Sequence, residues 1–78
     1  MNPINWDIST PEGMQNAVEW QTRHVSLLAE GGYWAVPRSM SVYRINANSR
    51  TAVKLCGLPE PDIARVFEAM GWKVVEAP

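Results

Sequence analysis

The single cysteine and the single histidine of this chain are the side chains best suited to nucleophilic chemistry. Cys56 and His24 would form a dyad if the fold brought them together, because a neighbouring base generates the reactive thiolate. No helix N-terminus follows Cys56 directly, so nothing local marks its thiol as activated. We therefore expect Cys56 to be a small apolar strand residue and His24 to border the buried side of a helix, while an enzyme using both stays open as a third hypothesis.

The sequence contains few residues suited to binding a metal ion or a phosphate group. Structural zinc sites use four nitrogen or sulfur ligands, often in close pairs, and this chain has only Cys56 and His24. Gly31-Gly32 fits neither GxxxxGK[ST] nor GxGxxG, the patterns that cradle phosphates. Glu60 and Asp62 flank a proline at an expected helix start, where acids favour the positive end of the helix. We predict no catalytic residue, no metal ligand and no cofactor.

Charge points most directly to a binding surface. The formal net charge is −1, but residues 31–59 contain four cations and no acid. The other residues carry three cations and all eight acids, a net charge of −5. The four cations of the basic segment are Arg38, Arg44, Arg50 and Lys54.

A β-hairpin is expected to present these cations. Residues 40–45 and 51–56 are rich in strand formers, and the Asn46–Ser49 cluster between them is typical of a turn. We predict that Arg44 and Lys54 share the exposed face of the hairpin, with Arg38 and Arg50 at the strand ends. The apolar side chains expected to face the core from these strands are Tyr43, Ile45, Val53 and Leu55.

Aromatic side chains could extend this surface. Trp6, Trp20 and Tyr33 lie near the edges of predicted elements, and exposed aromatics are common at contact surfaces. We include Tyr33 and Trp20 with the four cations as predicted partner-binding residues. The aromatic residues expected in the core are Trp34, Phe67 and Trp72.

The elements that must position these residues follow from periodicity and helix-capping signals. Residues 4–8 alternate like a strand, although an extended lead-in that tucks Trp6 against the fold explains the pattern equally well. Ser9 or Thr10 would cap the first helix, and Gly71 would end the second and let Trp72 fold back onto Phe67. We expect one helix at about residues 11–30 and a second that begins near residues 60–62 and ends near residue 70. We expect strands at residues 33–36, 40–45, 51–56 and 73–76.

This order predicts an α+β fold. The sheet would be a small antiparallel one, formed by a three-strand meander and a short C-terminal strand at an edge. The second helix is too short to be stable alone in water, so both helices are expected to pack on one face of the sheet.

Length and composition limit the kind of molecule. The chain has 78 residues, which suits a single domain spanning residues 1–78. One cysteine allows no internal disulfide and suits a reducing compartment. No apolar run reaches the ~20 residues that span a bilayer, and the first residues lack the pattern of a secretion signal, so we expect a cytoplasmic protein that does not bind membranes.

Two stretches resemble small proteins encoded by phages, prophages and plasmids of proteobacteria. They are Gly32–Ser39, followed by Tyr43–Ile45, and Ala69–Val74. The resemblance implies an accessory protein that binds and blocks a host protein, as anti-CRISPR proteins do, or a regulator that binds DNA. It carries over no functional residue, because we know no catalytic motif for this group.

The leading hypothesis is a non-enzymatic binding protein from a phage or mobile element. It would occupy an acidic surface on a host complex, such as a defence system, through the basic hairpin, and so act in the host bacterial cytoplasm. The alternative is a DNA- or RNA-binding regulator that uses the same hairpin, although the overall acidity counts against it. A homodimer is left open, since short sheets with an uncovered edge often pair.

Overall fold

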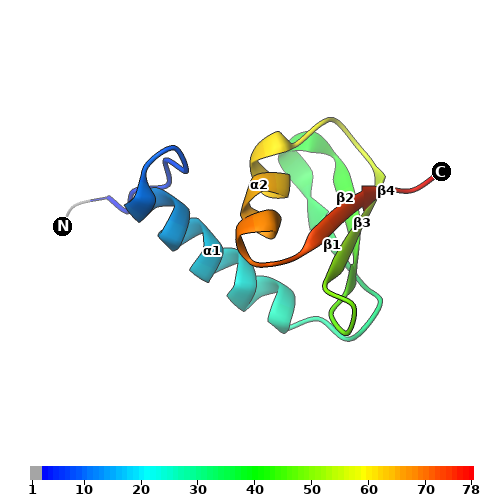
Figure 1. Cartoon of the computed structure of the whole chain (residues 1–78). Helices are drawn as coiled ribbons and strands as arrows, with labels where there is room; N and C mark the ends of the chain where they lie inside the picture. Colours follow the sequence, from blue (N-terminus) through cyan, green and yellow to red (C-terminus); the bar gives the residue numbers. More distant parts are fainter. Residues whose placement is uncertain (1–2) are drawn as a thin grey trace.

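The computed structural model describes residues 3–78 and has the predicted α+β element order (Figure 1). Two helices and a four-stranded sheet make up the fold, with a short 3-10 helix, η1, between the first two strands. The bounds are α1 Pro11–Ser26, β1 Gly32–Val36, η1 Pro37–Ser39, β2 Ser41–Asn46, β3 Thr51–Cys56, α2 Pro61–Ala69 and β4 Lys73–Glu76.

Helix α1 begins as the sequence predicts and ends earlier. The Thr10 hydroxyl accepts a hydrogen bond from the backbone N–H of Gly13 at 3.1 Å, which caps the helix start. The helix ends at Ser26 rather than near Glu30. It stops because the chain must turn toward the sheet, where the N–H of Gly31 donates to the carbonyl of Ile45 at 2.8 Å.

The N-terminal segment forms an extended lead-in rather than a strand. The side-chain amide of Asn16 donates to the backbone carbonyl of Asn5 at 3.0 Å and so ties this segment to α1. Trp6 meets the ring of Trp20 edge-on, with 6.4 Å between the ring centroids. The lead-in therefore places Trp6 against the first helix.

The strands follow one another across the sheet in the order β1-β2-β3-β4. β1, β2 and β3 form the predicted antiparallel meander, and β4 adds at the edge parallel to β3. The parallel direction arises because α2 is a crossover connection that returns the chain to the starting end of β3. The sheet is therefore mostly antiparallel rather than wholly so.

Helix α2 ends with the predicted glycine motif. Gly71 adopts a positive φ of 86°, and the N–H of Trp72 donates to the carbonyl of Phe67 at 2.9 Å. As a result, the ring of Trp72 packs against that of Phe67, with 5.5 Å between the ring centroids. This local turn sends the chain from α2 directly into β4.

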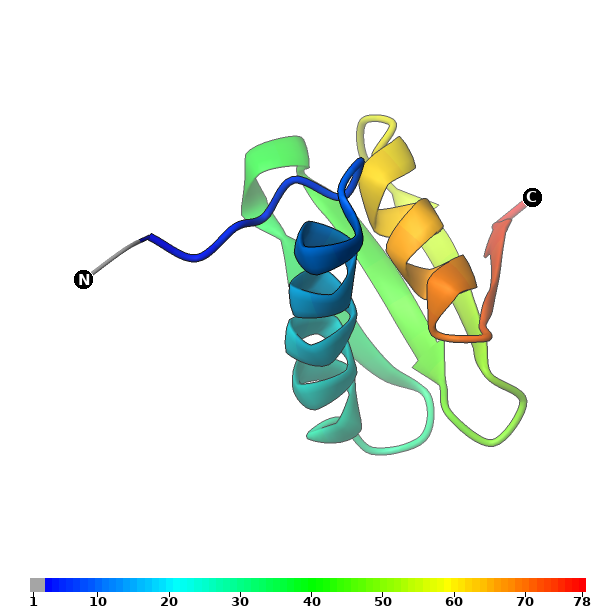
Figure 2. The ribbon, with the colours of Figure 1, turned by 60° about the vertical axis from the view of Figure 1, so that its left-hand side comes forward.

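The hydrophobic core cluster takes buried residues from both helices and from β1, β2 and β3, and we call the sheet face that carries Tyr43, Ile45 and Ala52 the inner face (Figure 2). Phe67 of α2 is fully buried and lies 5.8 Å from Trp34 and 6.1 Å from Tyr43, measured between ring centroids. The buried residues of the main cluster are Val25, Val36, Tyr43, Ile45, Ala52, Ile63 and Phe67.

The register between β2 and β3 contradicts one prediction. Ile45 lies opposite Ala52, and Tyr43 lies opposite Lys54, so Val53 and Leu55 do not face the core. Paired residues share a face of the sheet, and four turn residues, 47–50, set this pairing. A bulge at the other end of the hairpin shifts the register between Val42 and Tyr43. The small side chain of Ala52 shares the core with the large ring of Phe67.

Candidate binding surfaces

The predicted shared basic face of the hairpin is not present. Arg44 lies opposite Val53 on the face away from the core, which we call the outer face. Lys54 lies opposite buried Tyr43 on the inner face, where its ammonium donates to the carbonyl of Leu58 at 2.6 Å. The prediction was wrong because the register places Ala52 rather than Val53 in the core, which turns Lys54 to the other side.

Arg38 is separated from the hairpin and already has an acidic partner. Its Nε donates to a carboxylate oxygen of Glu60 at 3.0 Å. This hydrogen bond lowers the pKa of the Glu60 carboxyl and raises that of the Arg38 guanidinium. The Arg38 side chain nevertheless remains 70% exposed.

Arg50 lies at the turn end of the hairpin, in a positive-φ position. Its backbone carbonyl accepts a hydrogen bond from the N–H of Lys73 at 2.9 Å, which brings the start of β4 beside the turn. Both residues are exposed. Lys73 lies outside the basic segment of residues 31–59, and only the parallel pairing of β4 places it on the outer face.

The outer face combines apolar and basic side chains. Tyr33 of β1 lies opposite Arg44 of β2, and the guanidinium stands 5.7 Å from the centre of the tyrosine ring. Its Nη2 also donates to the tyrosine hydroxyl at 3.4 Å. Strand register places on this face Tyr33, Ala35, Val42, Arg44, Asn46, Thr51, Val53, Cys56, Lys73 and Val75, all at least partly exposed and none of them acidic.

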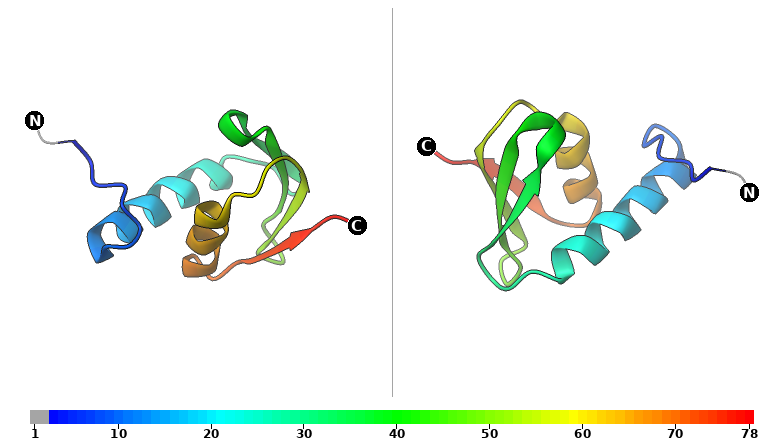
Figure 3. Two further views of the ribbon diagram at one scale, coloured as in Figure 1. Left: turned by 90° about the horizontal axis from the view of Figure 1, so that it is seen from above. Right: turned by 180° about the vertical axis from the view of Figure 1, so that it is seen from behind.

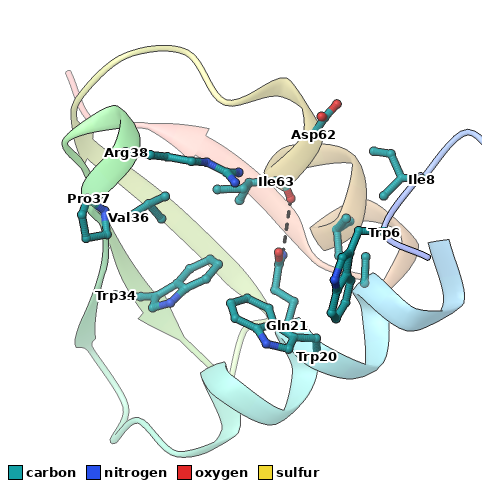
Figure 4. A pocket seen from close by; sticks show the side chains of 12 residues that line it. Trp6, Ile8, Trp20, Gln21, Trp34, Val36, Pro37, Arg38, Asp62 and Ile63 are labelled. Carbon is teal, nitrogen blue, oxygen red and sulfur yellow. Dashed lines mark hydrogen bonds between the residues drawn. The ribbon is translucent and has the colours of Figure 1, made fainter. Parts of the chain in front are cut away.

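A second surface is an apolar cleft of about 670 Å³ between α1, α2 and the β1–η1 segment (Figure 4). We call it the tryptophan cleft. Trp6 and Trp20 form one side and Trp34 the other, while Arg38 and Asp62 stand at its mouth. The remaining lining residues are Ile8, Ala17, Gln21, Val36, Pro37, Ile63 and Val66.

The aromatic walls of the cleft are held in place by neighbouring groups. The ring of Trp20 stacks on His24 with 3.9 Å between centroids, and His24 Nδ1 lies 2.7 Å from the Trp20 carbonyl oxygen. At the back of the cleft, the Gln21 amide donates to the carbonyl of Ile63 at 3.4 Å. Trp6 is nevertheless 51% exposed and Trp20 40% exposed. The cleft thus keeps large aromatic surfaces in contact with water.

Of the predicted site residues, Tyr33 and Arg44 lie together on the outer face, whereas Trp20 and Arg38 line the tryptophan cleft. The sequence marked Trp6 and Trp20 as edge residues but did not indicate the cleft. Its walls come from segments far apart in the sequence, so no local pattern reveals it.

The cysteine and the histidine are not brought together. Cys56 is exposed and lies opposite Val42 on the outer face, whereas His24 packs on Trp20 within α1. Within residues 3–78, the acids, Cys56 and His24 form no group of three or more that could hold a metal ion. None of the helices in that part of the chain is long and apolar enough to cross a membrane.

Comparisons with protein-family models, with curated proteins and with solved structures found no match to this chain.

Proposed function

We propose that this chain is a non-enzymatic binding protein that uses its outer face to occupy an acidic surface of a protein partner. In the setting that the sequence resemblance implies, it is an inhibitor from a phage or mobile element, and the partner is a host complex that it blocks sterically. One observation carries the proposal: the outer face holds the Tyr33–Arg44 pair, Lys73 and several aliphatic side chains, but no carboxylate.

The chemistry of the outer face suits a protein partner. Tyrosine and arginine are the residue types that most often anchor protein interfaces, and Arg44 already holds the Tyr33 ring in a defined position. Aliphatic residues beside them, such as Val53 and Val75, supply apolar area that a partner can bury. The eight acids lie elsewhere in the chain, so an acidic partner is attracted to this face and repelled by others.

A nucleic-acid regulator is the second candidate, supported by the same cations. The separation of Arg38 and Lys54 from Arg44 leaves fewer cations on the outer face than the hairpin prediction required. Nucleic-acid binding weakens with salt in proportion to the number of phosphates neutralised. A screen with duplex and single-stranded DNA and RNA at ~50 mM salt tests this alternative, and absence of binding there would remove it.

Charge reversal on the outer face is the direct test of the proposal. The variant Arg44→Glu/Lys73→Glu should weaken binding to a partner isolated with the wild-type chain by ~10-fold or more, because repulsion replaces attraction at the contact. The matched control is Arg23→Glu/Arg65→Glu, which makes the same charge change at exposed positions of the two helices. Equal losses in both variants would contradict a contact through the outer face.

Cys56 provides an independent measurement of the same contact. This exposed thiol is the only cysteine and lies on the outer face. A bound partner should slow its reaction with a maleimide, and prior attachment of a bulky maleimide should block binding. Unchanged labelling in the complex would show that the partner binds elsewhere.

A further inference from the structure

Strand β1 is an edge of the sheet that remains available for pairing. It hydrogen-bonds to β2 on one side, and within residues 3–78 no other strand lies on its second side. Its five residues, Gly32–Val36, carry no charge. Natural edge strands are usually protected by charges, proline or a covering segment, and an unprotected edge is a template for another strand.

The tryptophan cleft opens beside this edge. Seen from behind, α1 and β1 meet near the loop that joins them and spread apart toward η1 (Figure 3, right). Trp34 and Val36, two residues apart in β1, both line the cleft. Side chains alternate along a strand, so a strand added in the plane of the sheet would direct every second side chain toward the same side as Trp34 and Val36.

We propose that β1 and the tryptophan cleft together bind an extended apolar segment of a protein partner. The segment pairs with the free edge of β1 through its backbone and inserts a large apolar side chain between Trp6, Trp20 and Trp34. This site is distinct from the outer face and does not depend on the function proposed for it. Strand addition of this kind takes its affinity from backbone hydrogen bonds and its specificity from pockets for alternate side chains.

Arg38 lies where one end of the bound segment would be and can contact a polar group there. It is the single charged residue between Gly31 and Met40, and it lies directly after β1 at the mouth of the cleft. Glu60 occupies its Nε and Nη2, while Nη1 makes no hydrogen bond within the described residues. The free Nη1 can therefore donate a hydrogen bond to a carboxylate of the segment, in competition with the negative charges of Glu60 and Asp62 that already face Arg38.

A second copy of this chain is a poorer occupant of the cleft. Its own β1 would be the strand available for pairing, but Trp34 on that strand is already packed against Tyr43 and Phe67. Self-pairing at the edge would leave the cleft without a side chain to fill it. Self-association is accordingly an outcome that contradicts the proposal.

The test uses a display library of random linear ten-residue peptides, selected on the full chain. We expect enriched peptides to carry one large apolar residue among β-branched residues and an acid near one end. The variant Trp6→Ala, in the lead-in segment, should weaken a selected peptide at least ~5-fold, and Arg38→Gln should weaken it when the peptide carries the acid. Tyr33→Ala is the control, since Tyr33 lies on the same strand but faces outward.

Backbone chemistry separates strand addition from simple insertion of a side chain. Two versions of the selected peptide are compared, one N-methylated at the odd-numbered residues and the other at the even-numbered residues. One version should lose at least ~10-fold in affinity, because only every second backbone N–H of an added strand points toward β1. The amide protons of β1 should also exchange more slowly in the complex. The proposal would be overturned if no peptides were enriched, if Trp6→Ala bound a selected peptide as well as the wild type, or if N-methylation had no effect. A concentration-dependent dimer that protects the amide protons of β1 would also overturn it. None of these outcomes bears on the outer face, which the Arg44 and Lys73 variants test separately.

Discussion

Tyr43 shows how one residue links the core to the charged surface. It is almost fully buried, packs against Trp34 and Phe67, and lies opposite Lys54 in the hairpin. Burial is the main cause that raises the pKa of its hydroxyl, and the negative charges of Glu60 and Glu76 add to it. The folded state therefore favours the neutral phenol.

The pH dependence of stability should reveal this residue. The folded-state pKa of Tyr43 is raised, so its contribution is present below the ordinary tyrosine pKa of about 10 and is lost as pH rises through the folded-state value. Tyr43→Phe should flatten the fall in the free energy of unfolding above pH ~10. Urea denaturation at several pH values measures this, with exposed Tyr33→Phe as control. Identical alkaline profiles for Tyr43→Phe and the wild type would contradict the assignment.

At the residue scale, the sequence indicates what an individual side chain can do more readily than which side chains it contacts in the fold. The sequence left a Cys56–His24 dyad open as a third hypothesis, and the structure places the two side chains on different surfaces. It also included Tyr33 and Arg44 in one surface, and they face each other across two strands. The Arg38–Glu60 ion pair was not predicted, because it joins η1 to the N-cap residue of α2.

At the scale of elements, the junction between the lead-in and α1 determines where Trp6 stands. The Thr10 hydroxyl caps α1 and also accepts a hydrogen bond from the Asn5 amide at 3.1 Å. One side chain thus fixes both the start of the helix and the path of the segment that carries Trp6. The geometry of the tryptophan cleft depends on this junction.

Removal of the cap should therefore affect both stability and the cleft. Thr10→Ala should lower the free energy of unfolding by about 1 kcal/mol, the usual cost of losing an N-cap side chain. It should also shift the tryptophan fluorescence of the folded protein, because Asn5 loses its partner beside Trp6. Ser26→Ala is the control, since Ser26 bonds only its own exposed final turn. A Thr10→Ala variant as stable as Ser26→Ala would contradict the capping role.

Element ends were predictable where the signal is local. The Gly71–Trp72 motif was predicted from neighbouring residues and is confirmed. The sequence offered Ser9 or Thr10 as the cap of α1, and the structure shows Thr10 in that role. The end of α1 and the direction of β4 were not, because each depends on where the chain must meet the sheet. Tertiary contacts decide such boundaries even when helix propensity would allow a longer helix.

At the scale of the whole molecule, stability should be concentrated in the middle of the sheet. β2 is hydrogen-bonded on both sides, and its Tyr43 and Ile45 are buried together with Ala52 of β3. The lead-in and the α1–β1 loop have fewer buried residues. Local opening is easiest where little apolar surface is buried.

Amide hydrogen exchange should follow this arrangement. The slowest protons should belong to β2 and β3, and the fastest to residues 3–8 and 27–31, with exchange spanning several orders of magnitude in rate. Exchange measured by NMR at neutral pH checks the order. Slowest exchange in the first turns of α1 would show that the core lies elsewhere.

The sequence by itself determined the order and type of the elements, the caps and turns between them, and the uneven distribution of charge. These depend on neighbouring residues, so local periodicity and capping chemistry predict them. Only the tertiary structure decided which cations share a face, which strand edge is free and where the tryptophan side chains meet. A shift of one residue in strand register exchanges the two faces of a strand, and that register is set by the four-residue turn and by packing against Phe67. The composition of the outer face is a consequence of that register, whereas the tryptophan cleft depends on how the lead-in, α1, α2 and the β1–η1 segment meet.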